Sequence, residues 1–171
     1  MIEKANHTDI PALVTLLNSA YRGEASKKGW TTEANLISGE IRTDENQLTE
    51  LMNKPGSVFL KHVSNNGDIT GCVYLDKRLG KLYLGMLSVS PILQAQGTGR
   101  KIMQAAEDYA RQEGCPAIFM RVVSLRPELI AWYERQGYQK TGEIQPFENS
   151  SYGSATTPFD FLVMEKNISL Q

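Results

Sequence analysis

The chain has 171 residues, of which 41% are hydrophobic, and its formal net charge is −1. This length predicts one domain, residues 1–171, with a core of its own, and the near-zero charge gives no argument for binding nucleic acid or an anionic membrane. The two cysteines form no C-x-x-C pair and there are only two histidines, so we expect no metal site and a reducing compartment.

The N-terminal region carries no signal segment and the chain has no apolar run long enough to cross a bilayer, so a cytoplasmic location is expected. A short strand is predicted at 2–5. It precedes a helix that Thr8 or Asp9 caps and whose apolar residues recur at helical spacing as far as Tyr21. A polar stretch broken by glycines leads to a second helix at 44–53.

The second half of the chain alternates strands and helices. The Asn-Gly pair at 66–67 predicts a hairpin, and Gly85 indicates a bulge or a close backbone approach within its strand. The predicted strands are 57–63, 69–76, 81–89, 117–123, 138–145 and 159–166; the predicted helices are 99–113 and a short one that begins at Pro127. The connection 146–158 is long and rich in Ser, Thr and Gly.

The segment from Gln94 to Gly99 links an apolar strand to an amphipathic helix through two glycines. The first backbone N–H groups of a helix lack partners and favour an anion, and glycine lets the backbone approach a phosphate closely. Arg100 follows and adds positive charge. A Walker P-loop string is absent, and a dinucleotide fingerprint would require a third glycine that the sequence lacks. The segment therefore predicts a phosphate or pyrophosphate site, the alternative being a plain glycine-rich loop.

The string Gln94-Ala-Gln-Gly-Thr-Gly99 resembles the acetyl-CoA loop of the GNAT superfamily of N-acetyltransferases, [RQ]-x-x-G-x-[GA]. A second string, Tyr133-Glu-Arg-Gln-Gly-Tyr138, is similar to the other signature of that family, and its distance from the loop is typical. The resemblance implies an α/β (α+β) fold: a mixed, mostly antiparallel twisted sheet with helices on both faces. The two central parallel strands, 81–89 and 117–123, would splay apart around the pantetheine arm of CoA.

The resemblance also implies which residues bind the donor. Backbone N–H groups from Gln96 to Arg100 would face the pyrophosphate, and the strand edge at Leu87 and Val89 would pair with pantetheine, unless these two side chains only pack in the core. Many family members carry a CoA-contacting asparagine where this chain has Arg126; the arginine meets either an anionic group or water. The implied donor-site residues are Leu87, Val89, Gln94, Gln96, Gly97, Thr98, Gly99, Arg100 and Arg126.

Tyr133 stands where the family places the tyrosine that protonates the leaving thiolate; the alternative is an aromatic core residue. A backbone N–H near Met86 or Leu87 would stabilise the oxyanion. The strand before the loop offers no carboxylate. The candidates for the general base are therefore Glu24, Glu33 and Asp44 in the N-terminal segment, or ordered water. Each carboxylate has the alternative of being a solvated surface charge.

The resemblance implies transfer of an acetyl group from acetyl-CoA to a primary amine of a small molecule or peptide, without a metal. The alternative is a non-catalytic acyl-CoA-binding sensor or scaffold. In this family the acceptor site lies between segments corresponding here to 21–43 and 146–158. Trp30 with Glu24 and Glu33 would suit a cationic amine, whereas Arg22 and Arg42 would suit an acceptor with a carboxylate. The sequence leaves this choice, the acyl group and a homodimer open.

Overall fold

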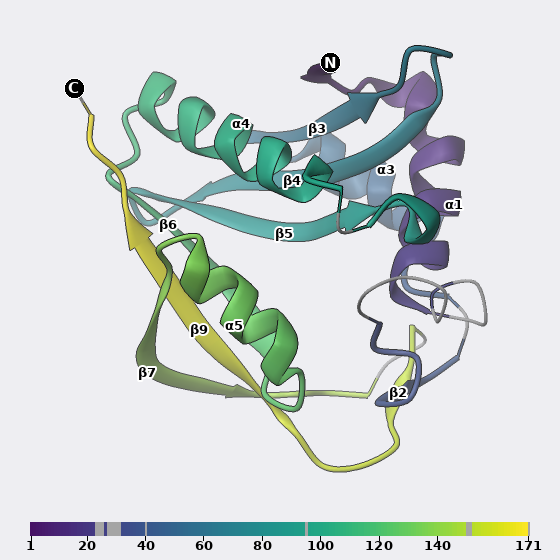
Figure 1. Ribbon diagram of the computed structural model, residues 1–171, viewed down its shortest axis with the longest axis vertical. Helices are drawn as coiled ribbons and strands as arrows, with labels where there is room; N and C mark the ends of the chain where they lie inside the picture. Colours follow the sequence, from purple (N-terminus) through teal and green to yellow (C-terminus); the bar gives the residue numbers. More distant parts are fainter. Residues whose placement is uncertain (23–25, 27–31, 40, 95, 150–151, 171) are drawn as a thin grey trace.

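The computed structural model describes residues 1–22, 26, 32–39, 41–94, 96–149 and 152–170. Within them a seven-stranded mixed sheet has the order β1-β3-β4-β5-β6-β9-β7 (Figure 1). Only β5 and β6 pair in parallel; the other neighbours pair antiparallel. The expected mixed, mostly antiparallel sheet is confirmed. Its strands are β1 (Ile2–Lys4), β3 (Ser57–Val63), β4 (Ile69–Arg78), β5 (Lys81–Val89), β6 (Ala117–Val123), β7 (Gln139–Pro146) and β9 (Asp160–Asn167).

The two central strands splay as expected. Strands β5 and β6 pair only where Leu82 lies beside Ile118 and Tyr83 beside Phe119, near the start of both strands. Figure 1 shows the ribbons of β5 and β6 diverging beyond this point, with α5 on one side of the divergence. Strand β5 therefore presents an edge without a β6 partner along its second half.

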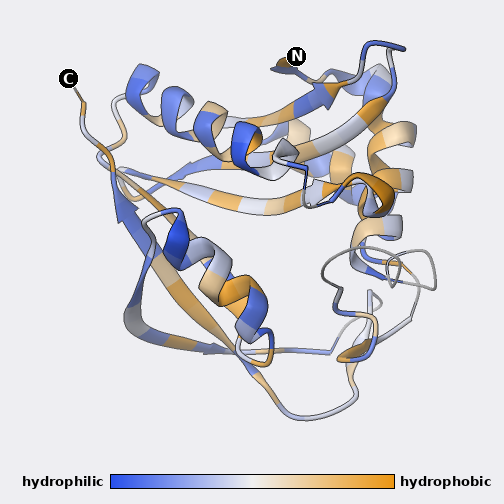
Figure 2. Cartoon of the chain, viewed as in Figure 1, coloured by the Kyte–Doolittle hydropathy of each residue, from blue (hydrophilic) through white to orange (hydrophobic). Residues whose placement is uncertain are grey.

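Helices cover both faces of the sheet, α1 (Ile10–Tyr21) and α3 (Glu45–Asn53) on one and α4 (Thr98–Gln112) and α5 (Pro127–Arg135) on the other (Figure 1). Figure 2 shows hydrophilic and hydrophobic residues alternating along α4 and α5. Alternate residues of β4 enter different cores: Val73 packs with the α4 side, and Cys72 and Tyr74 with the α1 side. Short 3-10 turns, η1 (His7–Asp9) and η2 (Pro91–Leu93), precede α1 and the loop before α4.

Asp9 stands at the N-cap position of α1, as predicted, but its side chain makes no capping hydrogen bond to that helix. Asn6 forms a capping box, in which its side chain accepts from Thr8 N at 2.9 Å and Asp9 Oδ2 accepts from Asn6 N at 2.9 Å. The box opens η1, and α1 continues from Ile10. The other helix and strand ends lie within about two residues of the prediction, the ordinary uncertainty of element boundaries.

A bulge in β5 falls at Met86, one residue after Gly85, for which the sequence predicted either a bulge or a close approach. Met86 has φ +53, and the register with β4 shifts between Cys72 and Tyr74. Before the bulge Leu84 faces the α4 side; after it Met86 faces the α1 side and Leu87 the α4 side. An extra residue reverses which face each side chain meets, so the bulge directs Leu87 toward α4 and α5.

Gly85 serves a different purpose from the predicted bulge. A Cβ at this position would lie 2.8 Å from the Tyr83 ring. The Tyr83 ring lies against Gly85 and packs with Phe119 of β6, the ring centroids being 5.5 Å apart. Glycine is needed here for the close approach of an aromatic side chain.

A second, two-stranded sheet joins the two polar connections and was not predicted. Strand β2 (Ile37–Ser38) pairs antiparallel with β8 (Ser154–Ala155). Thr156 N also donates to Leu36 O at 2.9 Å. These bonds hold segment 32–39 beside segment 152–156.

Candidate active site

The loop between β5 and α4 leaves the first backbone N–H groups of α4 without a capping side chain. Gly97 has φ +86, a left-handed conformation that favours glycine, and its carbonyl accepts from Lys101 N at 3.1 Å to begin α4. No side chain caps the helix at Gly97, and the first amides of a helix have no intrahelical partners. Gln94 Nε2 donates to Val89 O at 3.1 Å and ties the loop to the strand.

A cavity of about 440 Å³ lies between this loop and α5, and we call it the loop cavity. Eight of the ten residues proposed to bind the donor or to act as the acid line this cavity, together with residues that the sequence had not singled out. The lining residues are Ala20, Tyr21, Leu87, Val89, Gln94, Gly97, Gly99, Arg100, Arg126, Leu129, Trp132, Tyr133, Arg135 and Gln136.

Two predicted donor-site residues are placed differently. Gln96 and Thr98 belong to the same loop, but neither residue is among the described residues that line the loop cavity. Gln96 is exposed and Thr98 is half-buried as the first residue of α4. Their predicted contribution was through backbone N–H groups, which the helix start provides without requiring their side chains.

Helix α5 brings Tyr133 to the loop cavity. Pro127 occupies the first turn, where its missing N–H costs no hydrogen bond. Trp132 packs edge-on against Tyr133 with ring centroids 5.2 Å apart, and a Cβ on Gly99 would lie 3.5 Å from the Trp132 ring. The indole thus connects the start of α4 to α5.

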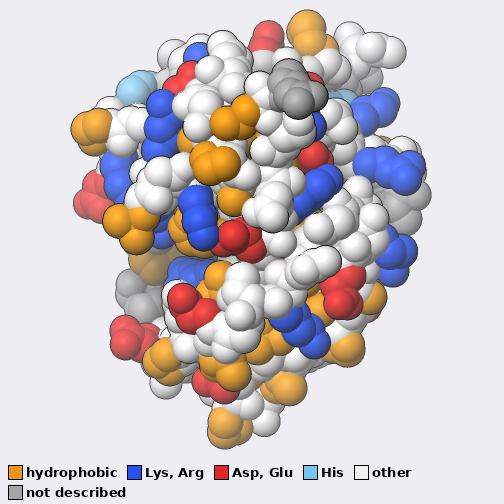
Figure 3. All heavy atoms as spheres, turned by 90° about the vertical axis from the view of Figure 1, so that its left-hand side faces the viewer, with side chains coloured by type: hydrophobic (Ala, Val, Ile, Leu, Met, Phe, Trp, Pro, Cys, Tyr) orange, Lys and Arg blue, Asp and Glu red, His pale blue; other side chains and the backbone are white. Residues whose placement is uncertain are grey.

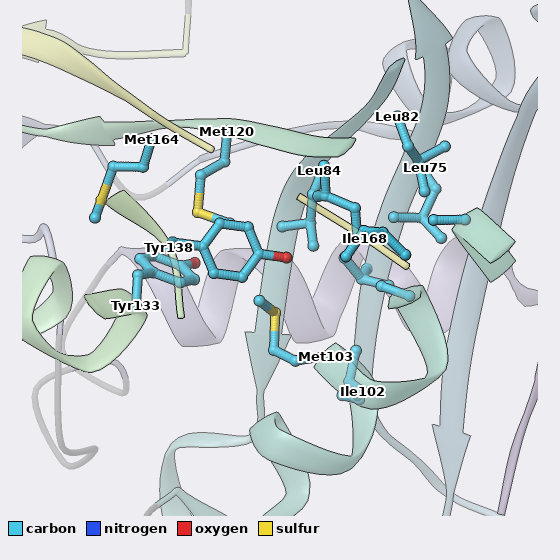
Figure 4. Close-up of a cluster of buried hydrophobic side chains, with 14 of the residues drawn as sticks. Leu75, Leu82, Leu84, Ile102, Met103, Met120, Tyr133, Tyr138, Met164 and Ile168 are labelled. Atoms are coloured by element: carbon cyan, nitrogen blue, oxygen red, sulfur yellow. The ribbon is translucent and has the colours of Figure 1, made fainter. Parts of the chain in front are cut away.

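Tyr133 is buried, with 6% of its surface exposed, and its ring lies beside that of Tyr138 (Figure 4). Its hydroxyl makes no hydrogen bond to any described residue and borders the loop cavity. Burial raises the pKa of this phenol well above its ordinary value, so the hydroxyl stays protonated at neutral pH. A buried but partnerless donor facing a cavity can serve a bound molecule.

Tyr138, the last residue of the second motif, packs in the core. It is 1% exposed and lies between α5 and the α4-side core (Figure 4). It lines neither of the two cavities described here.

A second cavity of about 580 Å³ adjoins the splay on the side of β2 and β8. Four arginines line it, so we call it the arginine cavity: Arg22, Arg42, Arg121 and Arg126. Both segments that the family resemblance implied for the acceptor contribute, through Glu33 and Ile37 on one side and Phe147 and Tyr152 on the other. Tyr21, Arg126, Leu129 and Tyr133 line both cavities.

Glu33 lies in a buried ion-pair network on the arginine cavity. Its Oε1 accepts from Arg22 Nε at 2.8 Å, and its Oε2 lies 3.8 Å from Arg126 Nη1. All three side chains are 4–5% exposed. The solvated-charge alternative for Glu33 is therefore wrong, and both carboxylate oxygens already face guanidinium groups.

Arg22 also joins the segments around the cavity. It donates to the backbone oxygen of Tyr152 and, at 3.3 Å, to that of Ile41. A buried guanidinium with several acceptors has a structural explanation, so of the two arginines considered for a substrate carboxylate, Arg22 is already engaged.

Two other carboxylates were considered as the general base, Asp44 and Glu24. Asp44 Oδ1 accepts from Gln47 N at 2.8 Å and caps α3, and Asp44 Oδ2 accepts from the Tyr152 hydroxyl at 3.0 Å. Asp44 thus has a structural role. Glu24 and Trp30, proposed from the sequence, lie outside the described residues.

Tyr21 is a site residue that the sequence analysis assigned only to a helix face. Its hydroxyl donates to Leu87 O at 2.8 Å, and its ring lies beneath the guanidinium of Arg42, 5.3 Å from the ring centroid. Burial raises its pKa to about 12. The only sequence signal was an aromatic residue at the polar end of an amphipathic helix.

Comparison with known proteins identifies the family. The family model "Acetyltransferase (GNAT) family" matches residues 11–138, which contain both cavities' shared tyrosines and the glycine loop. The chain belongs to the acetyltransferase (GNAT) family. It is also 28% identical over 86 residues to an acetyltransferase of Agrobacterium fabrum, a match covering 50% of this chain and 61% of that protein.

Solved structures share the GNAT fold. The ribosomal-protein-S18-alanine N-acetyltransferase of Escherichia coli superposes with a TM-score of 0.75 at 18% identity, covering 100% of this chain and 95% of that one. A streptothricin acetyltransferase described as putative, from Bacillus anthracis and in complex with acetyl coenzyme A, gives 0.60 at 18% identity, covering 70% and 67%. At these identities the likeness concerns the fold.

The surface of the described residues adds two observations. On the face shown in Figure 3, Lys and Arg side chains alternate with Asp and Glu and form no broad area of one sign. Among the described residues no helix has the length and apolarity to cross a membrane, and no group of three His, Cys, Asp or Glu side chains could hold a metal ion.

Proposed function

We propose that this GNAT-family chain transfers an acetyl group from acetyl-CoA to a primary amine, by direct attack in a ternary complex, within a single domain of residues 1–171. The observation that carries the proposal is the position of Tyr133, which lines both the loop cavity and the arginine cavity. A donor in one cavity and an acceptor in the other would meet beside its hydroxyl.

The loop cavity fits the donor. The uncapped start of α4 offers backbone N–H groups to a pyrophosphate, and Arg100 and Arg135 add positive charge at its wall. Leu87 and Val89, turned to this side by the bulge, lie on the strand edge that β6 leaves unpaired. An extended pantetheine arm can pair with such an edge.

The proposed reaction exchanges one bond for another. The acceptor nitrogen attacks the thioester carbon, a C–N bond forms and the C–S bond breaks, and the amine loses one proton. Tyr133 donates a hydrogen bond to the departing sulfur and passes its proton to the thiolate as the C–S bond breaks. Water then returns to the phenolate the proton that the amine released, so the enzyme ends in its starting state.

The bulge supports stabilisation of the oxyanion. Met86 and Leu87 stand outside the regular β4–β5 register, at the start of the splay. We propose that a backbone N–H of this pair faces the thioester oxygen. Glu33 contacts two guanidinium groups, which supports a role in positioning Arg126 rather than a role as the general base. In place of a carboxylate base, ordered water accepts the proton of the amine, or the acceptor amine arrives already neutral.

The first experiment measures release of the CoA thiol from acetyl-CoA with a panel of polyamines, aminoglycosides, amino acids and short peptides. Acceleration by one amine class, with mass spectrometry showing an acetylated amine, supports the proposal. Melting temperature with and without acetyl-CoA is measured in parallel, because a ligand of the native state raises it.

The alternative function, an acyl-CoA sensor or scaffold, predicts another result. Acetyl-CoA would raise the melting temperature while no amine accelerates thiol release. The partnerless hydroxyl of Tyr133 between the two cavities favours the enzyme, since a binding module needs no donor at that point.

A further inference from the structure

We propose that the acceptor is a free amino acid whose α-carboxylate is bound by Arg42 in the arginine cavity. This inference rests on the proposed function and names its substrate class. The inference goes beyond the proposed function because acetyl transfer requires only an amine, whereas a site that binds a substrate carboxylate excludes most amines.

The charge of the arginine cavity is the first argument. Its described lining contains four arginines against two carboxylates, those of Glu33 and Glu148. Glu33 already faces Arg22 and Arg126, and Glu148 is exposed at the edge. The wall is therefore cationic, which repels polyamines and aminoglycosides and attracts an acceptor that carries an anionic group.

Arg42 is a lining arginine whose charge no carboxylate of the described residues compensates. Unlike Arg22, it forms no ion pair with the described part of the chain; the same holds for Arg121, which lies over Phe161 and donates to Gln145 Oε1 at 3.5 Å. It is half-buried, and its guanidinium lies over the Tyr21 ring. An arginine stacked on an aromatic face keeps its fork of N–H donors directed sideways, the arrangement that binds a carboxylate with two parallel hydrogen bonds.

The backbone around Arg42 is held in place. Asn18 Oδ1 accepts from the backbone N–H groups of Arg42 at 2.6 Å and Thr43 at 3.0 Å, and Asn18 Nδ2 donates to Thr43 O at 3.2 Å. This clamp fixes residues 42–43 against α1. A binding group on a fixed backbone loses little entropy when its ligand arrives.

The position of Arg42 relates the carboxylate to the reacting atoms. Its guanidinium lies over Tyr21, and Tyr21 lines both cavities together with Tyr133. Tyr21 and Tyr133 therefore stand where the two cavities join. In an α-amino acid the amine and carboxylate share one carbon, so a carboxylate at Arg42 keeps the amine close to this junction.

The apolar wall indicates the side chain of the amino acid. Phe147 and Phe161 line the arginine cavity with ring centroids 5.8 Å apart, and Arg121 lies over Phe161 at 4.6 Å. These rings give the cavity lining an apolar surface beside Arg121. We therefore choose phenylalanine, leucine and methionine as probes.

The test compares each probe with its amide, which keeps the amine and side chain but lacks the negative charge and resembles a peptide N-terminus. Binding of N-acetyl-L-phenylalanine and N-acetyl-L-phenylalaninamide to the protein with CoA is measured by calorimetry at neutral pH. We expect about tenfold tighter binding of the acid, as charged hydrogen bonds require, and the same preference in kcat/KM for the three free amino acids.

Three variants test whether Arg42 causes the preference for the acid over the amide. Arg42→Gln abolishes it, Arg42→Lys retains part of it, and Arg111→Gln, which removes the same charge outside both cavities, leaves it unchanged. Melting curves show that each variant is folded. Equal or tighter binding of the amide, no saturable binding of the acid, or a preference that survives Arg42→Gln overturns the inference.

The two proposals fail separately. Acetylation of amides or polyamines in preference to amino acids overturns the inference and leaves acetyl transfer standing. Arg42-dependent binding of the acid, with no thiol released for any amine in the panel, contradicts the proposed transfer and retains the carboxylate site.

Discussion

Tyr21 at the end of α1 donates its hydroxyl hydrogen to the backbone oxygen of Leu87 in β5, across 2.8 Å. Leu87 follows the bulge at Met86 and borders the loop cavity. This bond therefore attaches the first helix to the strand edge proposed to bind the donor, and it stands between the two cavities.

Replacing Tyr21 by Phe should destabilise the protein by about 1–2 kcal/mol, because the Leu87 oxygen loses a buried donor. Urea unfolding at neutral pH measures this change. Tyr109→Phe is the control, because the Tyr109 hydroxyl bonds to none of the described residues and lies outside both cavities; it should change stability by less than about 0.5 kcal/mol. Equal effects of the two substitutions would contradict a structural role for the bond.

Tyr21 also predicts an alkaline effect. Burial raises its pKa in the folded protein to about 12, whereas the unfolded chain titrates near 10. Between these values the folded state holds a proton that the unfolded state has lost, so the contribution is complete below pH ~10 and disappears as pH rises through ~12. Urea unfolding from pH 8 to 11 should show a shallower decline for Tyr21→Phe than for the parent.

The location of the bulge shows what the pattern of the sequence could predict and what it could not. Alternation along β5 identified the strand, and its glycine indicated an irregularity. The irregularity lies one residue later, at Met86, and Gly85 instead makes room for the Tyr83 ring. A shift of one residue decides which side chains face the donor, and this depends on packing between β5 and β6 that no local pattern encodes.

Tyr133→Phe should lower kcat by about 100-fold or more, the range for loss of a general acid, while the affinity for acetyl-CoA stays within about twofold. Its stability should change little, because the hydroxyl has no described partner to lose. Tyr138→Phe removes a buried hydroxyl from the same core outside both cavities and should retain full turnover. A Tyr133→Phe protein as fast as the parent would refute the assignment.

The pH profile of the parent offers an independent check of the same group. Burial raises the pKa of Tyr133 above its ordinary value near 10. The acid form therefore persists across neutral and mildly alkaline pH, and kcat should show no decline due to this phenol below pH ~10. A fall of kcat centred between pH 7 and 9, absent from Tyr133→Phe, would contradict a buried neutral phenol.

Gly97→Ala should weaken acetyl-CoA binding. A residue with a Cβ at φ +86 costs about 1–2 kcal/mol, and relief of that strain would move the first amides of α4. Gly80→Ala is the matched control: Gly80 has φ +79 in the β4–β5 turn, and a Cβ there, as at Gly97, meets nothing within 4 Å. Both variants should lose similar stability by urea unfolding, and only Gly97→Ala should bind acetyl-CoA less tightly by calorimetry.

In the site, as in the fold, features carried by consecutive residues could be predicted from the sequence, and contacts between distant segments could not. The glycine loop and the start of α5 could be identified because each is carried by consecutive residues. The partners of Glu33 could not, because Arg22 and Arg126 reach it from separate segments, and β2 and β8 meet across more than a hundred residues. Isolated charges in a polar stretch do not indicate which of them are buried.

The buried network around Glu33 gives the largest expected effect on stability. Glu33→Gln removes the negative charge that Arg22 and Arg126 share while all three side chains remain 4–5% exposed. Leaving the buried Arg22 guanidinium without the Glu33 carboxylate costs about 3–5 kcal/mol. The surface pair Lys77–Glu113, whose side chains are 42% and 29% exposed, provides the control Glu113→Gln, with an expected loss of about 0.2–1 kcal/mol.

The same substitution separates a positioning role from a catalytic base. If Glu33 holds Arg126 and the acceptor segments, Glu33→Gln raises KM for the acceptor and lowers the melting temperature, and kcat at saturating acceptor falls less than about tenfold. A general base would instead lose about 100-fold or more in kcat. A large loss of kcat in a variant of unchanged stability would therefore return Glu33 to the role first expected from the sequence.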